Sequence, residues 1–346
     1  DAKHHHTVVS LMGDGKYGPL LRDAGIDVHC LGMPAGRIRV RSLLKLRNVL
    51  RMEKPDVVQT WMYHANLIGG LIAWSVGIRK VFWGIHHTNL EPTHSKRSTV
   101  AVARLCAYLS RWIPRKVVYC AEEAARAHVD HGYAAQKYVV IPNGYDLNRF
   151  RPDIDARSRL REELEIGAHA ALVGMVGRFH PYKDHKGLIR SLSILKEQGI
   201  QFNCILVGQG LDEGNAQLAG WLREAGLENH VILLGQRNDI PGVMNALDVH
   251  VLSSITEGFP NVAAESMACG TPCVTTDVGD ARFIVGNTGW VVPPSNPEAL
   301  AGAIVEALRE MNNRDLWTKR QSAARCRIEN HFGIEVMIQA YHTTWS

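Results

Sequence analysis

Short runs of β-branched and aromatic residues alternate along the chain with longer stretches whose apolar residues recur at helical spacing. The first five runs occupy residues 5–12, 27–33, 56–60, 80–85 and 116–121. Five further runs occupy residues 171–176, 202–208, 231–235, 248–254 and 272–276. Strands that alternate with helices form parallel sheets. We therefore predict an α/β protein with two Rossmann-like, doubly wound parallel sheets.

Residues 141–153 separate the two series of strands and are rich in residues that favour turns, namely Pro142, Asn143, Gly144 and Pro152. We predict a linker here, a first domain over residues 1–150 and a second over residues 151–330. A helix expected at about 331–346 is a candidate to pack back on the first domain. Since open parallel sheets bind ligands at the carboxyl ends of their strands, we expect a central cleft that both sheets face.

The composition is that of an ordinary globular protein, with 346 residues of which 46% are apolar, enough for two cores. The seven cysteines are odd in number and scattered, and Cys269 and Cys273 lack the paired spacing of a zinc site. This usage favours the reducing cytoplasm. The longest apolar stretch, residues 66–78, falls short of the ~20 residues that a membrane-spanning helix needs, so we expect no span and no signal peptide.

Positive charge is concentrated in the first half of the chain. Residues 1–150 contain 21 Lys and Arg against 11 Asp and Glu, whereas residues 151–346 contain 18 against 23, so the halves carry +10 and −5. Basic runs at residues 37–54 and 96–116 are compatible with a solvated helix face or with peripheral docking on an anionic membrane surface. No recognised nucleic-acid motif accompanies the charge, so we expect no nucleic-acid partner.

The segment 253–270, SSITEGFPNVAAESMACG, carries the strongest chemical pattern. Glu257 follows a predicted strand and Glu265 comes eight residues later on a predicted helix, which Pro260 begins and Gly270 ends. Helix amino ends attract phosphate, and a carboxylate on the helix can accept hydrogen bonds from ribose hydroxyls. The alternative is two solvated glutamates beside an ordinary helix cap. The backbone expected to surround the helix start belongs to Gly258, Phe259, Asn261 and Val262.

Two cations follow the first predicted strand of the second domain, in the segment VGRFHPYKD (176–184). Arg178 and Lys183 are expected at the same sheet edge as Glu257. Two cations suit a diphosphate leaving group, because they stabilise the charge that builds on it when the bond to its sugar breaks. The alternative is a pair of surface cations in a polar loop.

Together these segments closely resemble glycosyltransferase family 4, retaining enzymes of the GT-B fold whose pattern includes two glutamates eight residues apart. The segments that carry the resemblance are residues 140–146, 176–178 with Lys183, 206–210, 238–241, 257–265 and 276–280. By resemblance, Arg178 and Lys183 bind the donor diphosphate, Glu265 binds the ribose and Glu257 the donor sugar. The 258–262 backbone lines the donor pocket. The family pattern normally begins with a strand, a glycine-rich loop and a helix that are not visible before residue 6.

The first domain contributes a histidine pair, His86 and His87, just past the strand at residues 80–85. His87, which precedes Thr88, resembles the histidine of related enzymes that faces the donor, and we take it as a catalytic candidate together with Glu257. His86 is the second choice, and a purely structural pair is the alternative.

The expected activity is metal-independent, retaining transfer of a sugar from a UDP- or GDP-sugar to a hydroxyl acceptor, a glycan or a lipid-linked glycan. No cofactor and no metal site are expected, since no cluster of metal-ligating residues is evident. A non-catalytic protein of the same fold that binds sugar nucleotides remains an alternative. Epimerisation of a nucleotide sugar fits the glutamate and cation pattern less well.

Overall fold

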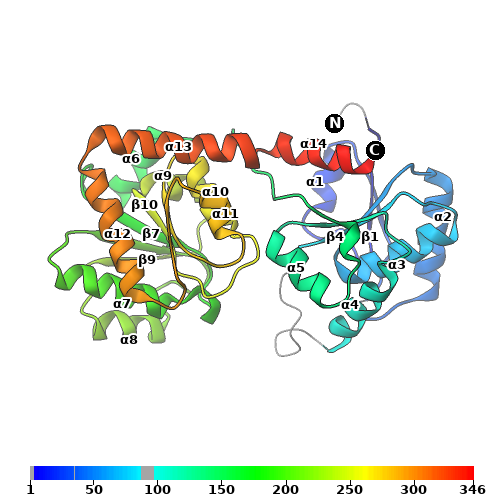
Figure 1. The fold of residues 1–346 in the computed structure, drawn as a ribbon, viewed down its shortest axis with the longest axis horizontal. Helices are drawn as coiled ribbons and strands as arrows, with labels where there is room; N and C mark the ends of the chain where they lie inside the picture. Colours follow the sequence, from blue (N-terminus) through cyan, green and yellow to red (C-terminus); the bar gives the residue numbers. More distant parts are fainter. Residues whose placement is uncertain (1–3, 35, 87–96) are drawn as a thin grey trace. The chain divides into compact units, whose positions relative to one another are not determined.

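The computed structural model describes residues 4–34, 36–86 and 97–346. The chain divides into two compact units, each of which is described by itself (Figure 1). The first comprises residues 1–119, 124–140 and 344–346, and the second comprises residues 120–123 and 141–343. The main segment of the second unit thus begins at residue 141, where the segment that we predicted as a linker begins, and the predicted boundary near residue 150 lies inside that unit.

The first unit contains two parallel sheets. β1 (Thr7–Ser10) pairs with β2 (Asp27–Cys30), and a four-stranded sheet has the order β3-β4-β5-β6. The strands of that sheet are β3 (Val58–Trp61), β4 (Val81–Ile85), β5 (Lys116–Tyr119) and β6 (Tyr138–Val140). The helices are α1 (Gly18–Asp23), α2 (Val40–Glu53), α3 (Met62–Ser75), α4 (Arg97–Leu109) and α5 (Glu122–Asp130), with a 3₁₀ turn at Ala135–Lys137. Residues 5–12 and 27–33 therefore form strands as predicted, but they pair with each other in a separate sheet.

The second unit is built on one six-stranded parallel sheet with the order β12-β11-β10-β7-β8-β9. Its strands are β7 (Leu172–Val176), β8 (Asn203–Val207), β9 (Val231–Gly235), β10 (Val249–Leu252), β11 (Cys273–Thr276) and β12 (Trp290–Val292). The chain starts at β7, winds outward to β9 and returns to β10 on the other side of β7. This reversal is the switch point of a doubly wound sheet, where a crevice forms beyond the strand ends.

Helices cover both faces of this sheet. They are α6 (Ile154–Glu163), α7 (His185–Glu197), α8 (Ala216–Glu224), α9 (Ile240–Ala246), α10 (Asn261–Ala268), α11 (Ala281–Val285), α12 (Pro297–Met311) and α13 (Arg314–Phe332). The last helix, α14 (Ile334–Trp345), follows α13. α7 packs against α8 and α12, while α10 packs against α9, α11 and α13 (Figure 1). The core between sheet and helices is aliphatic, with Val173, Met175, Leu188, Leu192 and Ile304 almost fully buried.

Polar side chains fix the starts of several helices. Asp153, Asp184, Asn215 and Asn296 each accept a hydrogen bond from a backbone N–H in the first turn of the helix that follows. Such caps satisfy amide groups that the helix itself leaves unpaired. Trp345, at the end of α14, forms a hydrogen bond within the first unit: its Nε1 donates to Gln59 Oε1 (3.1 Å).

Two observations bear on the sequence-based expectations about cysteines and membrane spans. All seven cysteines are free thiols. Within the described ranges, no helix combines the length and the apolar character needed to cross a bilayer.

Candidate functional site

The loop after β7 places two cations at the carboxyl edge of the sheet. Gly177 N–H donates to the Val207 carbonyl (2.8 Å) and Phe179 N–H to the Gln209 carbonyl (2.7 Å), so the loop stays beside β8 past the strand end. A 3₁₀ turn, Pro181–Lys183, then leads into α7. Arg178 and Lys183 therefore lie on a loop whose backbone is fixed at both ends.

A glycine in the next strand–helix turn makes this loop geometry possible. Gly208 has φ of +148°, and a Cβ built on it would overlap the Gly177 carbonyl oxygen. Only glycine permits both the backbone angle and the close approach of the two loops. The glycine-rich turn at residues 206–210, a weak pattern in the sequence, thus shapes the path of the backbone that precedes Arg178.

The structure brings Lys183 and Glu257 together across the switch point between β7 and β10. Lys183 Nζ lies 2.6 Å from Glu257 Oε1, and the two side chains are only 19% and 15% exposed. The same carboxylate oxygen accepts a hydrogen bond from Ser254 Oγ (2.7 Å). A partly buried, charge-assisted hydrogen bond of this kind is stronger than a neutral one. Two residues predicted to bind different parts of a donor are thus direct neighbours.

The backbone between Glu257 and α10 forms a compact turn. Asp280 N–H donates to the Gly258 carbonyl (2.9 Å), and a Cβ on Gly279 would overlap that same carbonyl oxygen. Phe259 is buried and Pro260 occupies the position before the first helical residue, Asn261. The helix therefore starts one residue later than Pro260.

The first turn of α10 is held by residues from the segment that precedes α6. Asn261 Oδ1 accepts hydrogen bonds from Asn143 Nδ2 (2.9 Å) and from the Tyr145 hydroxyl (2.7 Å). Asn261 itself is exposed and Val262 is half-buried. The Asn143 and Tyr145 contacts explain why the NGY sequence at residues 143–145 belongs with the second unit: it supports the helix that carries Glu265.

Glu265 is half-buried on α10. Burial raises the pKa of its carboxyl group, and the positive charge of Arg149 opposes this effect. Within the described part of the chain, no hydrogen-bond donor is recorded for its carboxylate. Glu265 is therefore a carboxylate with free acceptor capacity near a cation, as binding to hydroxyl groups requires.

Two buried histidines lie near Lys183. His185 and His250 are 3% and 0% exposed, and the Nε2 atom of each is buried without a hydrogen-bond partner in the described structure. Burial and, secondarily, the Lys183 charge lower the pKa of His185 to about 4 and of His250 to about 3. Both rings are therefore neutral near pH 7 and add no positive charge to the site.

The structure leaves two of the predicted positions less defined. Arg178 follows Gly177 on the β7 loop and is exposed, and its guanidinium forms no ion pair with any described residue. His87 lies outside the described residues. His86 follows β4, where its ring packs edge-on against Trp61 with the centroids 5.0 Å apart, and desolvation lowers the pKa of its imidazole.

Sequence reasoning did not select Ser253 and Ser254 as site residues. They follow β10, are 1% and 0% exposed, and both hydrogen-bond to the Lys183–Glu257 region. The signal was present in the run DVHVLSS, because two hydroxyl groups at the end of an otherwise apolar buried strand need partners.

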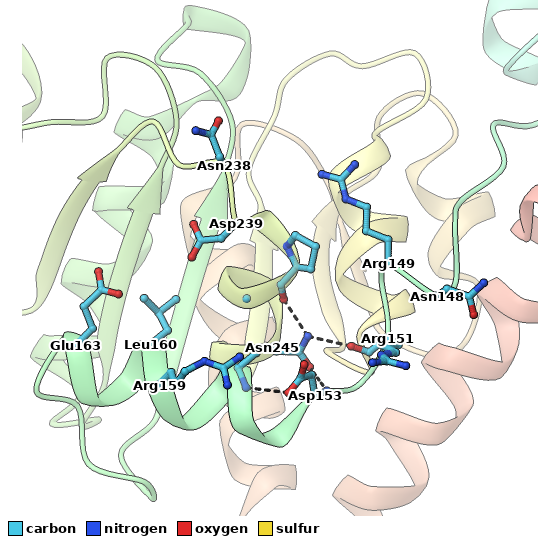
Figure 2. A pocket seen from close by; sticks show the side chains of 13 residues that line it. Asn148, Arg149, Arg151, Asp153, Arg159, Leu160, Glu163, Asn238, Asp239 and Asn245 are labelled. Atoms are coloured by element: carbon cyan, nitrogen blue, oxygen red, sulfur yellow. Dashed lines mark hydrogen bonds between the residues drawn. The ribbon is translucent and has the colours of Figure 1, made fainter. Parts of the chain in front are cut away.

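A separate hollow of about 600 Å³ lies between α6, α9 and the segment 148–153 (Figure 2). Its lining contains none of the predicted site residues. Its acidic side chains are engaged: Glu163 and Asp239 both pair with Arg237, at 2.6 and 2.7 Å, and Asp153 caps α6. The hollow is therefore a second polar surface of this unit, next to the loop at residues 236–239, and not the place where Lys183 and Glu257 meet.

Metal-ligating side chains do not gather in the described structure. Among residues 4–34, 36–86 and 97–346, no group of three His, Cys, Asp or Glu side chains is placed to hold an ion.

Solved structures similar to this chain are glycosyltransferases of the GT-B fold. A glycosyltransferase from Rickettsia africae superposes with a TM-score of 0.83 at 20% identity, over 99% of this chain and 90% of that one. Anabaena HepE, solved in complex with UDP, superposes with a TM-score of 0.80 at 24% identity, over 98% and 91%. Sucrose-phosphate synthase from Thermosynechococcus elongatus gives a TM-score of 0.73 at 21% identity, over 97% of both chains. The predicted GT-B fold is confirmed.

Two family models cover most of the sequence. Residues 1–149 match the model described as Glycosyltransferase Family 4, and residues 156–323 match Glycosyl transferases group 1. The chain belongs to the glycosyltransferases that combine these two domains.

Curated relatives agree with this assignment. An Escherichia coli UDP-Gal:alpha-D-GlcNAc-diphosphoundecaprenol alpha-1,3-galactosyltransferase is 26% identical over 269 residues, which are 77% of this chain and 70% of that protein. The putative glycosyltransferase EpsF of Bacillus subtilis is 34% identical over 159 residues, which are 46% of this chain and 41% of EpsF.

Proposed function

We propose that this glycosyltransferase moves a sugar from a UDP-sugar to a hydroxyl group of a lipid-linked or polysaccharide glycan, with retention of configuration. The observation that carries the proposal is the Lys183–Glu257 pair, which joins a cation and a carboxylate at 2.6 Å across the switch point of the second unit's sheet. A sugar nucleotide complements this pair, because its anionic diphosphate can bind the Lys183 ammonium group and its sugar hydroxyl groups can donate hydrogen bonds to the Glu257 carboxylate.

We assign the diphosphate to Arg178 and Lys183, the ribose to Glu265 and the donor sugar to Glu257. Arg178 and Lys183 share the fixed loop after β7, so their positive charges act from one side. The Gly258–Val262 backbone and the start of α10 lie beside Glu257 and contribute N–H groups to the same pocket. We retain His87 as a catalytic candidate on the family resemblance alone.

The transfer breaks the bond between the anomeric carbon and the oxygen of the β-phosphate, and the electron pair leaves with that oxygen. The acceptor oxygen bonds to the anomeric carbon from the same face, and its proton passes to the departing phosphate oxygen. Lys183 and Arg178 stabilise the charge on the phosphate, while the Glu257 carboxylate balances positive charge on the sugar. No side-chain nucleophile is required, and we propose that no metal ion takes part.

Uridine is our choice of base. HepE has been solved with UDP and with UDP-glucose, the latter structure 25% identical to this chain, and the Escherichia coli relative is named for a UDP-Gal donor. These names support UDP over GDP without fixing the sugar.

Calorimetric titration of the protein with UDP, GDP and NAD, each with and without EDTA, tests the donor site. We expect UDP alone to bind, equally well with EDTA. Transfer from UDP-glucose, UDP-galactose and UDP-N-acetylglucosamine is then followed by NMR of the product's anomeric proton. An inverted anomer, or activity that EDTA abolishes and Mg²⁺ restores, contradicts the mechanism. UDP binding without transfer to any tested acceptor favours the non-catalytic alternative.

The first unit has a surface suited to an acceptor held at a membrane. α3 and α4 pack together, and the exposed aromatic side chains of this region include Trp74 on α3, Tyr108 on α4 and Trp112 just after α4, which are 41%, 60% and 52% exposed. Arg79 lies over the Trp74 ring at 4.4 Å, and Tyr108 packs against Trp112 with the ring centroids 4.8 Å apart. Aromatic rings together with arginines favour the interface of an anionic bilayer.

We therefore propose peripheral association with an anionic leaflet through this unit. Flotation with vesicles of phosphatidylcholine alone, or with added phosphatidylglycerol, tests it. We expect binding only to the anionic vesicles, weakened by Trp112→Ala and by high salt. Equal recovery with both vesicle types would remove the proposal and leave the transfer reaction unaffected.

A further inference from the structure

Ser253 and Ser254 are neighbours in sequence but hold opposite members of the ion pair. Ser253 Oγ donates to the Lys183 carbonyl (2.8 Å) and, more weakly, to the Asp184 carbonyl (3.3 Å). Ser254 Oγ donates to Glu257 Oε1 (2.7 Å). Both serines are almost completely buried, so water does not compete for these bonds.

The two serines are themselves fixed by the sheet. Ile255 N–H donates to the Tyr182 carbonyl (2.9 Å), which ties the segment after β10 to the loop after β7. Thr276 Oγ1, at the end of β11, donates to the Ser254 carbonyl (2.6 Å). The hydroxyl groups therefore project from a backbone anchored to both neighbouring strands of β10.

This arrangement distinguishes the two oxygens of Glu257. Oε1 accepts from Lys183 and from Ser254, whereas no hydrogen bond to Oε2 is recorded among the described residues. Bonds to one oxygen from two directions fix the rotation of the carboxylate about its last torsion angle, which is otherwise broad. Oε2 is thereby left as the acceptor for a hydroxyl group of the donor sugar.

We propose that Ser253 and Ser254 are positioning residues of the transferase site: Ser254 orients the Glu257 carboxylate, and Ser253 holds the backbone from which Lys183 reaches the diphosphate. The inference rests on the proposed function. Neither serine touches the reacting atoms, so the two act through different partners. Loss of Ser254 then affects the chemical step, while loss of Ser253 affects nucleotide binding.

The test compares Ser254→Ala and Ser253→Ala with Ser191→Ala. Ser191 is a matched control, because it is also 0% exposed and its Oγ contacts two backbone carbonyls, those of Gly187 (3.0 Å) and Pro297 (2.9 Å), on the buried side of α7. All three variants are expected to lower Tm by similar amounts. Ser254→Ala should lower kcat about tenfold with donor KM nearly unchanged, since a bond to a charged group is lost. Ser253→Ala should raise the UDP Kd about fivefold with kcat largely kept.

A second measurement shows whether Ser254 acts through Glu257. In a Glu257→Ala background, adding Ser254→Ala should cause no further loss of kcat, because the partner of the hydroxyl is already gone. The assignment would be overturned if Ser254→Ala lowered kcat in the Glu257→Ala background as much as it does in the wild-type protein. It would also be overturned if the Ser253→Ala and Ser254→Ala variants had the same kcat and UDP Kd as Ser191→Ala.

Failure of the proposed function gives a different result. A wild-type protein that binds UDP without turnover favours the non-catalytic alternative and overturns the role of Ser254 in a chemical step, and the UDP Kd of Ser253→Ala then decides the role of Ser253 by itself. A wild-type protein that binds no UDP overturns both the proposed function and this inference.

Discussion

Glu257→Gln removes the negative charge from the centre of the candidate site while keeping the shape of the side chain. Glu257 Oε1 receives Lys183 Nζ at 2.6 Å and Ser254 Oγ at 2.7 Å. A glutamine oxygen can still accept both bonds, but it no longer attracts the ammonium group or balances positive charge on the donor sugar. The substitution therefore isolates the electrostatic part of the role of Glu257.

The magnitude follows from the burial of the pair. Removing one member of a fully buried ion pair costs about 3–5 kcal/mol, and a charge-assisted hydrogen bond contributes about 1.5–3 kcal/mol. Because the two side chains are 15% and 19% exposed, some screening by water remains and the lower range applies. We take about 2 kcal/mol of lost transition-state stabilisation, which corresponds to a fall in kcat of about 30-fold.

The effect on nucleotide binding has the opposite sign. Lys183 loses its charged partner in the variant, so its ammonium group is more available to a diphosphate. UDP should then bind at least as tightly as to the wild-type protein, although turnover falls.

The assay combines calorimetry with UDP and steady-state kinetics with the best UDP-sugar. Glu213→Gln is the matched control, because Glu213 is an exposed loop residue of the same unit and carries the same change of charge. Glu213→Gln should leave both the UDP Kd and kcat unchanged. A UDP Kd raised more than tenfold by Glu257→Gln, with kcat intact, would show that Glu257 supports the nucleotide and would refute the division of roles.

Further predictions concern the nucleotide site and the scaffold beneath it. Glu265→Ala should raise the UDP Kd about tenfold or more, through loss of charge-assisted bonds to ribose, and nearly normal binding in calorimetry would exclude the ribose role. Burial raises the pKa of Glu265, so UDP affinity should begin to fall on acidification at a pH above that expected for an ordinary glutamate; a pH titration of Glu265→Gln should lack this component. Gly208→Ala should displace the Gly177 backbone, lowering Tm and UDP affinity together, whereas Gly220→Ala, in open space on α8, should leave Tm unchanged or raise it. Asp248→Ala should reduce the free energy of unfolding by about 3–5 kcal/mol, because two arginines that pair with Asp248 at 2.6 and 2.7 Å lose their counter-charge; a change in urea midpoint within error would contradict this reasoning.

Most strands were predictable because they read as short apolar runs, and the interior strands of the two larger sheets are almost entirely buried. Nine of the ten predicted runs contain a strand of the structure, for example residues 171–176 around β7 and 248–254 around β10, and the run 56–60 overlaps β3 except for Trp61. Two strands were missed, β6 and β12, which have three residues each. Three residues are too few to show a recognisable pattern of apolar and polar positions. These two segments form strands because they pair with β5 and β11.

The sequence by itself determined the fold class, the two-part organisation and the candidate residues, because local apolar periodicity and the spacing of Glu257 and Glu265 are properties of a single segment. The tertiary structure alone decided which of these residues meet. Lys183 and Glu257 are 74 positions apart and touch because β10 returns to the side of β7, a consequence of strand order that no local pattern contains. The same return buries Ser253 and Ser254, and only burial turns two ordinary hydroxyl groups into obligatory hydrogen-bond partners of that pair.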